Sequence, residues 1–438
     1  MANLSLDNEI AYDALSYAWD PPKDSKRVFF PNSYLLIREN LHWALVHLRN
    51  PTYPRYLWIN ALCINQSDND EESAQIQRMR SIYARASRIV IWLGLPMSNS
   101  DLGIDVVNNK DLFRPLYDTG EENVFNFGNR IEIHNMGLTQ RESIALFKLV
   151  ERSWWTRIWS LQEVAVSKQD PIITCGNKSA PWGAFATITK QAAEAEASLP
   201  FGLWQGATIQ KLRNTCDFVL IREQMQENAL TMSLGALLRR TVDLNSTDPR
   251  DKIYALLGLA HAGHLDPLLP DYSKSPKHIF IETMRHVLLD ERRLDSLSFI
   301  PISKRPKAKP SEGLPSWVTD WTIQSTQTQP LWHPGLYNAA KENPARIIPS
   351  EDPDTLCQEG LHLDTVSIGS DVIMTKINWH NQSDIAELIK AIERLDEMLK
   401  QIVKELSTSI NPVTDPDVWQ RTQSLDPDPH ISDVNLDR

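Results

Sequence analysis

The alternation of short apolar runs with helical patterns between residues 10 and 176 constrains the fold most strongly. The run at 88–93 reads Arg-Ile-Val-Ile-Trp-Leu and is apolar on both faces, which is typical of an interior parallel strand. Further strand-like runs occupy 14–19, 56–59 and 172–175. Strands that alternate with helices predict a parallel sheet with right-handed crossovers. We therefore expect an α/β fold.

Three helices are expected between these strands. The first runs from a cap at Asn32 or Ser33 to residue 50, because leucines and alanines recur at helical spacing there. The second covers 68–86 and carries acidic residues in its first turn, as the helix dipole favours. The third is a long helix over 141–166. The stretch at about 95–139 is rich in Asn and Asp, and we interpret it as an irregular insertion.

The chain divides into several regions by composition and periodicity. The parallel sheet belongs to a first domain over 1–180, and helical periodicity dominates a second region over 181–300. A basic linker bracketed by prolines follows at 301–311. Residues 312–405 form a small mixed α/β region with one amphipathic helix, and the Pro/Asp-rich tail at 406–438 is expected to be disordered.

Charge and cysteine usage exclude several classes of protein. Lys and Arg number 45 against 56 Asp and Glu, so the net charge of -11 provides no positive field for a nucleic acid. No apolar run approaches the roughly 20 residues of a membrane span. The start of the chain lacks the features of a secretory signal, and four cysteines without a C-x-x-C pair indicate reduced thiols. We expect a cytoplasmic protein without a membrane span or a nucleic-acid partner.

The common cofactor and catalytic motifs are absent from the sequence. It contains no G-x-G-x-x-G, G-x-x-x-x-G-K-[ST], G-x-S-x-G or H-E-x-x-H, which argues against nucleotide-binding folds of these kinds, serine hydrolases and zincins. His261 and His264 have a spacing that could share a metal, but no nearby cysteine or acidic partner completes a tetrahedral set. We expect neither a bound cofactor nor a metal.

Four segments that contain tryptophan together resemble the fungal heterokaryon incompatibility (HET) domain. They are LSYAWD at 15–20, LWINALCINQ at 57–66, IYARASRIVIWLG at 82–94 and WWTRIWSLQE at 154–163. Two positions depart from the family, which commonly has Gly at Asp20 and Asp at Asn60. The resemblance implies a role in nonself recognition and programmed cell death. It also implies self-association or other incompatibility proteins as partners.

The HET domain is in turn distantly similar to the TIR domain, which has a flavodoxin-like sheet. The segment YDALSY at 12–17 is similar to the first TIR strand, and Glu163 follows Trp159 at the spacing of the TIR catalytic glutamate. This similarity implies NAD as a possible substrate and Glu163 as the catalytic residue. The residues that could bind the substrate lie near expected strand ends or beside Glu163: Tyr17, Trp19, Asp20, Asn60, Asn65 and Trp159.

Physical reasoning leaves the role of Glu163 open. On one continuous helix Trp155, Trp159 and Glu163 would share a face, and a carboxylate in such apolar surroundings is costly unless it is paired or used. A catalytic carboxylate could stabilise the positive charge that develops on ribose as nicotinamide leaves. Alternatively Glu163 anchors the helix by pairing with Arg152 or Arg157, the tryptophans are core, and the domain is a non-enzymatic interaction module.

One arginine outside the first domain is also a candidate for this site. Asp248, Pro249 and Asp251 are the residues expected at the start of a helix, with Asp248 as its cap, so Arg250 is the unexplained member of that segment. We expect Arg250 to clamp a carboxylate of the first domain, and Glu163 is one possibility.

Overall fold

The computed structural model describes most of the first 358 residues. The described ranges are 11–19, 25–30, 33–65, 68–97, 99–109, 138–197, 207–227, 232–261, 263–294, 296–297, 313–323, 344–348, 350, 352 and 354–358. All of them belong to one compact unit. The expected linker at 301–311, the amphipathic helix and the tail lie outside the described residues.

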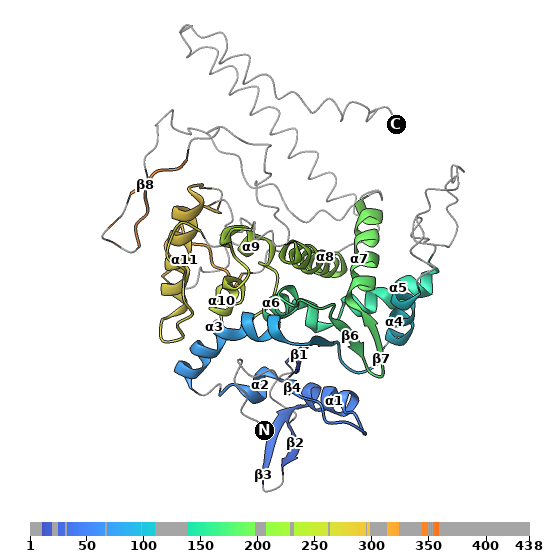
Figure 1. Cartoon of the computed structure of the whole chain (residues 1–438). Helices are drawn as coiled ribbons and strands as arrows, with labels where there is room; N and C mark the ends of the chain where they lie inside the picture. The colour runs from blue at the N-terminus through green and yellow to red at the C-terminus, as the bar shows by residue number, and fades with distance from the viewer. Residues whose placement is uncertain are drawn as a thin grey trace, which may run out of the picture. The chain divides into compact units, whose positions relative to one another are not determined.

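Five strands form the central sheet in the order β4-β1-β5-β6-β7 (Figure 1). The strands are β1 (Asp13–Tyr17), β4 (Leu57–Trp58), β5 (Arg88–Trp92), β6 (Ile172–Cys175) and β7 (Lys178–Pro181). The first four are parallel, and β7 pairs antiparallel with β6 at the edge. The parallel strands, counted along the chain, lie in the order 2-1-3-4, which is the beginning of the flavodoxin-like order. The predicted α/β fold is confirmed.

Alternate residues of β1 contribute to different sides of the core. Ala14 belongs to a large cluster together with side chains of α3 and α6, whereas Leu15 and Tyr17 belong to a second cluster with side chains of α1. The period of two along a strand requires this division. Ser16 falls on the same side as Ala14, which matters for the site described below.

The expected helix from residue 33 is a strand followed by a shorter helix. β2 (Ser25–Phe30) and β3 (Ser33–Arg38) form an antiparallel hairpin, and α1 (Glu39–Leu48) begins only after it. The leucines between 33 and 38 pair across the hairpin instead of continuing the apolar stripe of α1. A short helix that was not predicted, α2 (Asn60–Cys63), follows β4.

The expected helix at 68–86 is confirmed as α3 (Asn69–Arg85), and the carboxylate of Asp68 accepts hydrogen bonds from the first turn. The prediction of one continuous helix over 141–166 is wrong. This segment consists of α5 (Gln140–Val150), a 3-10 turn at Ser153–Thr156 and α6 (Ile158–Ala165). Part of the expected insertion is α4 (Ser100–Asn108), which packs on α5, and residues 110–137 lie outside the described part.

The region after the sheet is helical, as predicted. Its helices are α7 (Trp182–Ala197), α8 (Ala207–Gln226), α9 (Leu234–Arg240), α10 (Asp251–Leu257) and α11 (Pro276–Glu291). Helices α8 and α10 both pack against α6, so this region covers the helix that carries Glu163. A small antiparallel pair, β8 (Ile347–Ile348) and β9 (Cys357–Gln358), lies further along the chain.

Candidate functional site

Glu163 lies in the middle of the structure rather than at its surface. Helix α6 directs the side chain toward β1, where the hydroxyl of Ser16 donates a hydrogen bond to Oε2 of Glu163. The indole of Trp154 donates in turn to Oγ of Ser16 at 2.7 Å. Glu163 is 1% exposed, and Ser16 and Trp154 are fully buried. The three side chains form a buried chain of hydrogen bonds between the sheet and the helix layer.

Two further side chains set the electrostatics of this carboxylate. Burial raises the pKa of Glu163, while the positive charge of Arg157 and hydrogen bonds from Ser16 and Tyr83 act against the rise. The guanidinium of Arg157 donates to the backbone carbonyl of Tyr17. Arg157 therefore affects Glu163 mainly through its charge, and it ties the start of α6 to the end of β1.

Tyr17 and Trp19 lie on the side of the sheet that faces away from Ser16. The side chain of Tyr17 is 2% exposed and packs with residues of α1, and Trp19 packs against the same cluster. The ring of Trp19 lies below two guanidiniums, those of Arg38 at 4.8 Å and Arg157 at 5.9 Å from its centroid. Arg157 is thus the residue that connects the surroundings of Trp19 with those of Glu163.

The remaining polar candidates near the strand ends are dispersed. Asn60 is buried at the start of α2, where its side-chain oxygen accepts from the Ala61 backbone at 2.7 Å. Asn65 is exposed, and its backbone N–H donates to Glu71 at 3.1 Å. Asp20 lies outside the described residues. These two asparagines take part in local interactions around α2 and α3.

Trp159 contacts the helical region instead of Glu163. Its indole hydrogen-bonds to the carboxylate of Asp251, which also accepts from the hydroxyl of Tyr272 at 2.5 Å. Burial raises the pKa of Asp251 to about 6, against the effect of these two hydrogen bonds. Trp159 and Asp251 thereby join α6 to α10.

The predicted clamp by Arg250 on Glu163 is wrong. The guanidinium of Arg250 binds both oxygens of Asp248, at 2.9 Å and 2.5 Å, and the backbone carbonyl of Tyr272 at 2.6 Å. Asp248 also accepts from the Arg250 backbone, so it orders the turn before α10. Arg250 holds the 248–251 segment against the Tyr272 segment.

The helical region binds α6 through two further close contacts. Arg222 of α8 donates to the carbonyls of Val164, Ser167 and Gln169 at 2.6, 2.8 and 2.9 Å, and so caps the end of α6. At the end of α10, a Cβ on Gly258 would collide with the side-chain amide of Gln162. A Cβ at position 258 would therefore require the buried side chain of Gln162 to move.

The proposed tryptophan stripe beside Glu163 is divided by the break before α6. Trp155 lies in the 3-10 turn, is fully buried, stacks on Phe185 with ring centroids 4.9 Å apart, and meets Phe218 edge to face at 5.7 Å. Trp154 also contacts Phe218, at 5.4 Å. These tryptophans form an aromatic core with α7 and α8, as expected of large buried rings.

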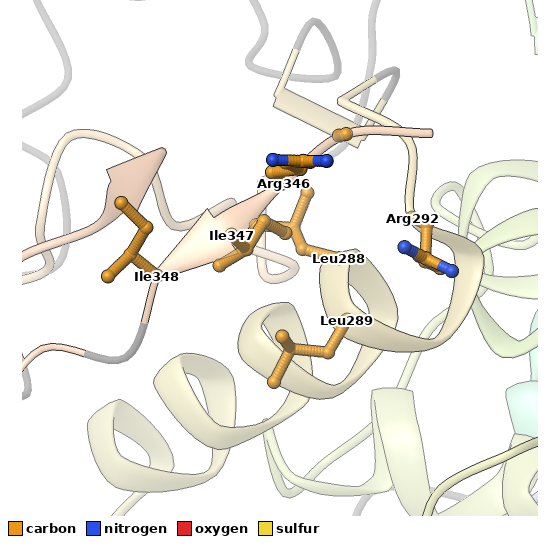
Figure 2. A pocket seen from close by; sticks show the side chains of 7 residues that line it. Leu288, Leu289, Arg292, Arg346, Ile347 and Ile348 are labelled. Carbon is orange, nitrogen blue, oxygen red and sulfur yellow. The ribbon is translucent and has the colours of Figure 1, made fainter. Parts of the chain in front are cut away.

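Other kinds of site were sought in the described residues. A hollow of about 340 Å³ lies between α11 and β8 (Figure 2), and its lining includes Leu288, Ile347, Arg292 and Arg346. None of the sequence-predicted site residues lines it. The described part of the chain contains neither a group of three potential metal ligands nor a helix long and apolar enough to cross a bilayer.

Three residues of the site were missed at the level of sequence. Ser16 and Tyr83 contact the carboxylate, and Asp251 contacts Trp159. Ser16 offers a usable signal, because it is a polar residue inside an otherwise apolar strand and must find a buried partner. Nothing in the local pattern marks Tyr83 or Asp251 as neighbours of α6.

Two comparisons with known proteins found similarity. The family model described as "Heterokaryon incompatibility protein (HET)" matches residues 12–163, from the start of the sheet to Glu163. A curated relative, "Heterokaryon incompatibility protein 6, OR allele" of Neurospora crassa, is 25% identical over 374 residues. The aligned part is 73% of this chain and 54% of the relative, so the chain spans about half of that protein's length. No solved structure matches the chain.

The matched residues contain three of the four parallel strands, β1, β4 and β5, and most of the helix that carries Glu163. The four tryptophan-containing segments singled out in the sequence all overlap this match. Residues 12–163 therefore carry a match to the heterokaryon incompatibility (HET) family, and the chain is similar to a heterokaryon incompatibility protein over most of its length.

Proposed function

We propose that this chain acts in heterokaryon incompatibility, as a signalling or effector protein of fungal nonself recognition that works through contacts with other proteins. The HET match and the Neurospora crassa relative support this role. Self-association or binding to other incompatibility proteins would transmit the signal, and programmed cell death would be the outcome. The action takes place in the cytoplasm, consistent with cysteines that form no disulfide at Cys63, Cys175, Cys216 and Cys357.

The burial of Glu163 is the observation that favours an interaction module over an enzyme. A catalytic carboxylate must touch the reacting atoms, and Glu163 is 1% exposed with Oε2 bound to Ser16. In this arrangement Glu163 serves as an internal anchor that joins α6 to β1. The hydrogen-bonded chain from Trp154 through Ser16 gives the carboxylate a structural purpose without catalysis.

NAD hydrolysis through Glu163 is the second candidate. It is favoured by the position of Ser16, the penultimate residue of β1, because ligands of open α/β sheets bind at the carboxyl ends of strands where the order reverses. Cleavage would break the bond between nicotinamide and C1 of ribose, with the electron pair leaving on nicotinamide. Water would then add to the ribose cation. Glu163 would stabilise that cation only after α6 moves to admit the ribose.

Expression of the full chain in a filamentous fungus, with cell viability and cellular NAD measured together, distinguishes the two mechanisms. The variants are Glu163→Gln and, as a matched control, Glu151→Gln, whose carboxylate lies at the surface in an ion pair with Lys148. An interaction module predicts cell death with an undiminished NAD pool before viability falls. Hydrolysis predicts early NAD loss that Glu163→Gln abolishes and Glu151→Gln preserves.

Two results would contradict these assignments. The incompatibility role would be refuted if cell viability after fusion of incompatible strains were the same whether or not the strains produce the chain. Early NAD loss that persists in folded Glu163→Gln protein would refute the assignment of Glu163, because another group would then have to stabilise the ribose cation.

A further inference from the structure

The hairpin of β2 and β3 carries an exposed apolar face that the functions proposed above do not use. It forms a two-stranded sheet of its own and contacts α1, beside which it lies in Figure 1. The register pairs Phe29 with Tyr34 next to the turn, Arg27 with Leu36 behind them, and Ser25 with Arg38 at the base. These six residues alternate along the strands and therefore share one face.

The two faces of the hairpin have different surroundings. On the inner face Ile37 is 5% exposed, and Val28 packs against the same cluster as α1. On the outer face Phe29 is 74% exposed, Leu36 58% and Tyr34 52%. Substitution of an outer-face residue therefore removes little packing. Covering the two aromatic rings on this face would be favourable, because it would remove apolar surface from water.

The apolar and charged residues are separated along the hairpin. The aromatic pair lies next to the turn, and Arg27 follows two positions behind Phe29, about 7 Å along the strand. Arg38 lies further back, and Lys26 on the inner face pairs with Glu39 at 3.4 Å. Neither strand contains an acidic residue. The hairpin is thus apolar at its end and basic behind it.

This order matches the layers of a lipid surface with anionic headgroups. Aromatic rings prefer the boundary between headgroups and acyl chains, and Lys or Arg placed behind them reach the phosphate level. Basic residues near an anionic leaflet contribute attraction that depends on salt. The guanidinium of Arg27 already lies 4.7 Å from the ring centroid of Tyr34, so aromatic and charged groups would enter the interface together.

A second copy of the chain fits this face less well. The exposed side chains of Phe29, Tyr34 and Leu36 on this face offer roughly 350 Å², less than half of the about 800 Å² per partner of a standard protein interface. Two hairpins facing each other would also bring like charges together, including both copies of Arg27. We propose that the outer face of the β2–β3 hairpin docks onto anionic lipid surfaces.

Vesicle flotation with the full chain tests this assignment. The probes are phosphatidylcholine vesicles with and without phosphatidylserine. The test variants are Phe29→Ser with Tyr34→Ser, and Arg27→Gln alone. The controls are Leu269→Ser, which removes a side chain that is 64% exposed elsewhere, and Arg88→Gln, which removes an exposed arginine at the start of β5.

We expect binding to the vesicles that contain phosphatidylserine, reduced by added salt. The aromatic double variant should lower the partition coefficient at least about tenfold and Arg27→Gln about threefold, with both controls unchanged. Circular dichroism of each variant should match the wild type, because all the altered side chains are at the surface. Arg27→Gln provides a test that removes a charge and keeps both aromatic rings.

Three results would overturn the assignment. The first is the absence of binding to the anionic vesicles. The second is binding that the hairpin variants leave unchanged or that does not require phosphatidylserine. The third is an oligomer in lipid-free solution, measured by light scattering, that the aromatic double variant dissociates, because the face would then belong to a second copy.

Discussion

Substitution of Glu163 by glutamine and by alanine separates the charge of this buried side chain from its shape. Alanine removes the acceptor for Ser16 and leaves buried hydrogen-bonding groups without a partner, at about 1–3 kcal/mol each. It also leaves a cavity between α6 and β1, so the expected total loss of unfolding free energy is about 3–5 kcal/mol. Glutamine keeps the volume and an acceptor for Ser16, and should cost less than about 1 kcal/mol.

The raised pKa of Glu163 determines how this difference changes with pH. Because the folded pKa lies above the unfolded one, the folded state binds the proton more tightly. The contribution to stability is therefore complete below the unfolded pKa and is lost as pH rises through the folded pKa. Glutamine does not titrate. The stability of Glu163→Gln relative to the wild type should therefore rise as pH increases from the unfolded pKa of Glu163 to its folded pKa.

Urea unfolding followed by tryptophan fluorescence, between about pH 4 and pH 8, measures both effects. The expected order at neutral pH is Glu163→Ala well below the wild type and Glu163→Gln close to it. Equal losses for the two variants would refute the reasoning. They would mean that attraction between the ionised carboxylate and Arg157 outweighs the cost of burying the charge.

Three further predictions concern the junction between α6 and the helical region. The pKa of Asp251 is raised to about 6, so the contribution of its proton to stability is lost as pH rises from about 4 to about 6. Asp251→Asn should therefore reduce the change in unfolding free energy over this pH interval, measured by thermal unfolding, by up to about 3 kcal/mol. Arg222→Met should lower the unfolding free energy in urea by about 3 kcal/mol, whereas Arg213→Met, at an exposed position of the same helix, should change it by less than about 0.5 kcal/mol. Gly258→Ala should cost about 2 kcal/mol by calorimetry, while Gly183→Ala, whose Cβ would meet only ordinary contacts, should be tolerated; equal effects would contradict the proposed close approach.

Residues with strong local signals were predicted correctly, and residues whose structure depends on distant partners were not. The interior strand at 88–93 and the helix that follows Asp68 are evident from composition and capping. The segment 33–38 has the leucine content of a helix, yet it pairs antiparallel with 25–30. The break before α6 accompanies the packing of Trp155 against α7 and α8, a long-range interaction that helical periodicity does not report.

The candidate site shows the same dependence on distance along the chain. Sequence spacing identified Glu163 and Trp159 and placed both on one helix. It gave no indication that Glu163 would bind Ser16, 147 positions earlier, or that Trp159 would bind Asp251. Burial of a carboxylate is set by what packs over it, and that information resides in α8 and α10 rather than in the helix itself.

The aromatic contacts of Trp154 and Trp155 have a practical consequence for anyone who isolates the HET domain. Their partners Trp182, Phe185 and Phe218 all come after residue 163, where the family match ends. A fragment that ends with that match would expose two indoles to water, together with the face of α6 that α8 and α10 cover. Such a fragment would be prone to aggregate. The smallest piece that keeps the covering layer of these rings extends through α8.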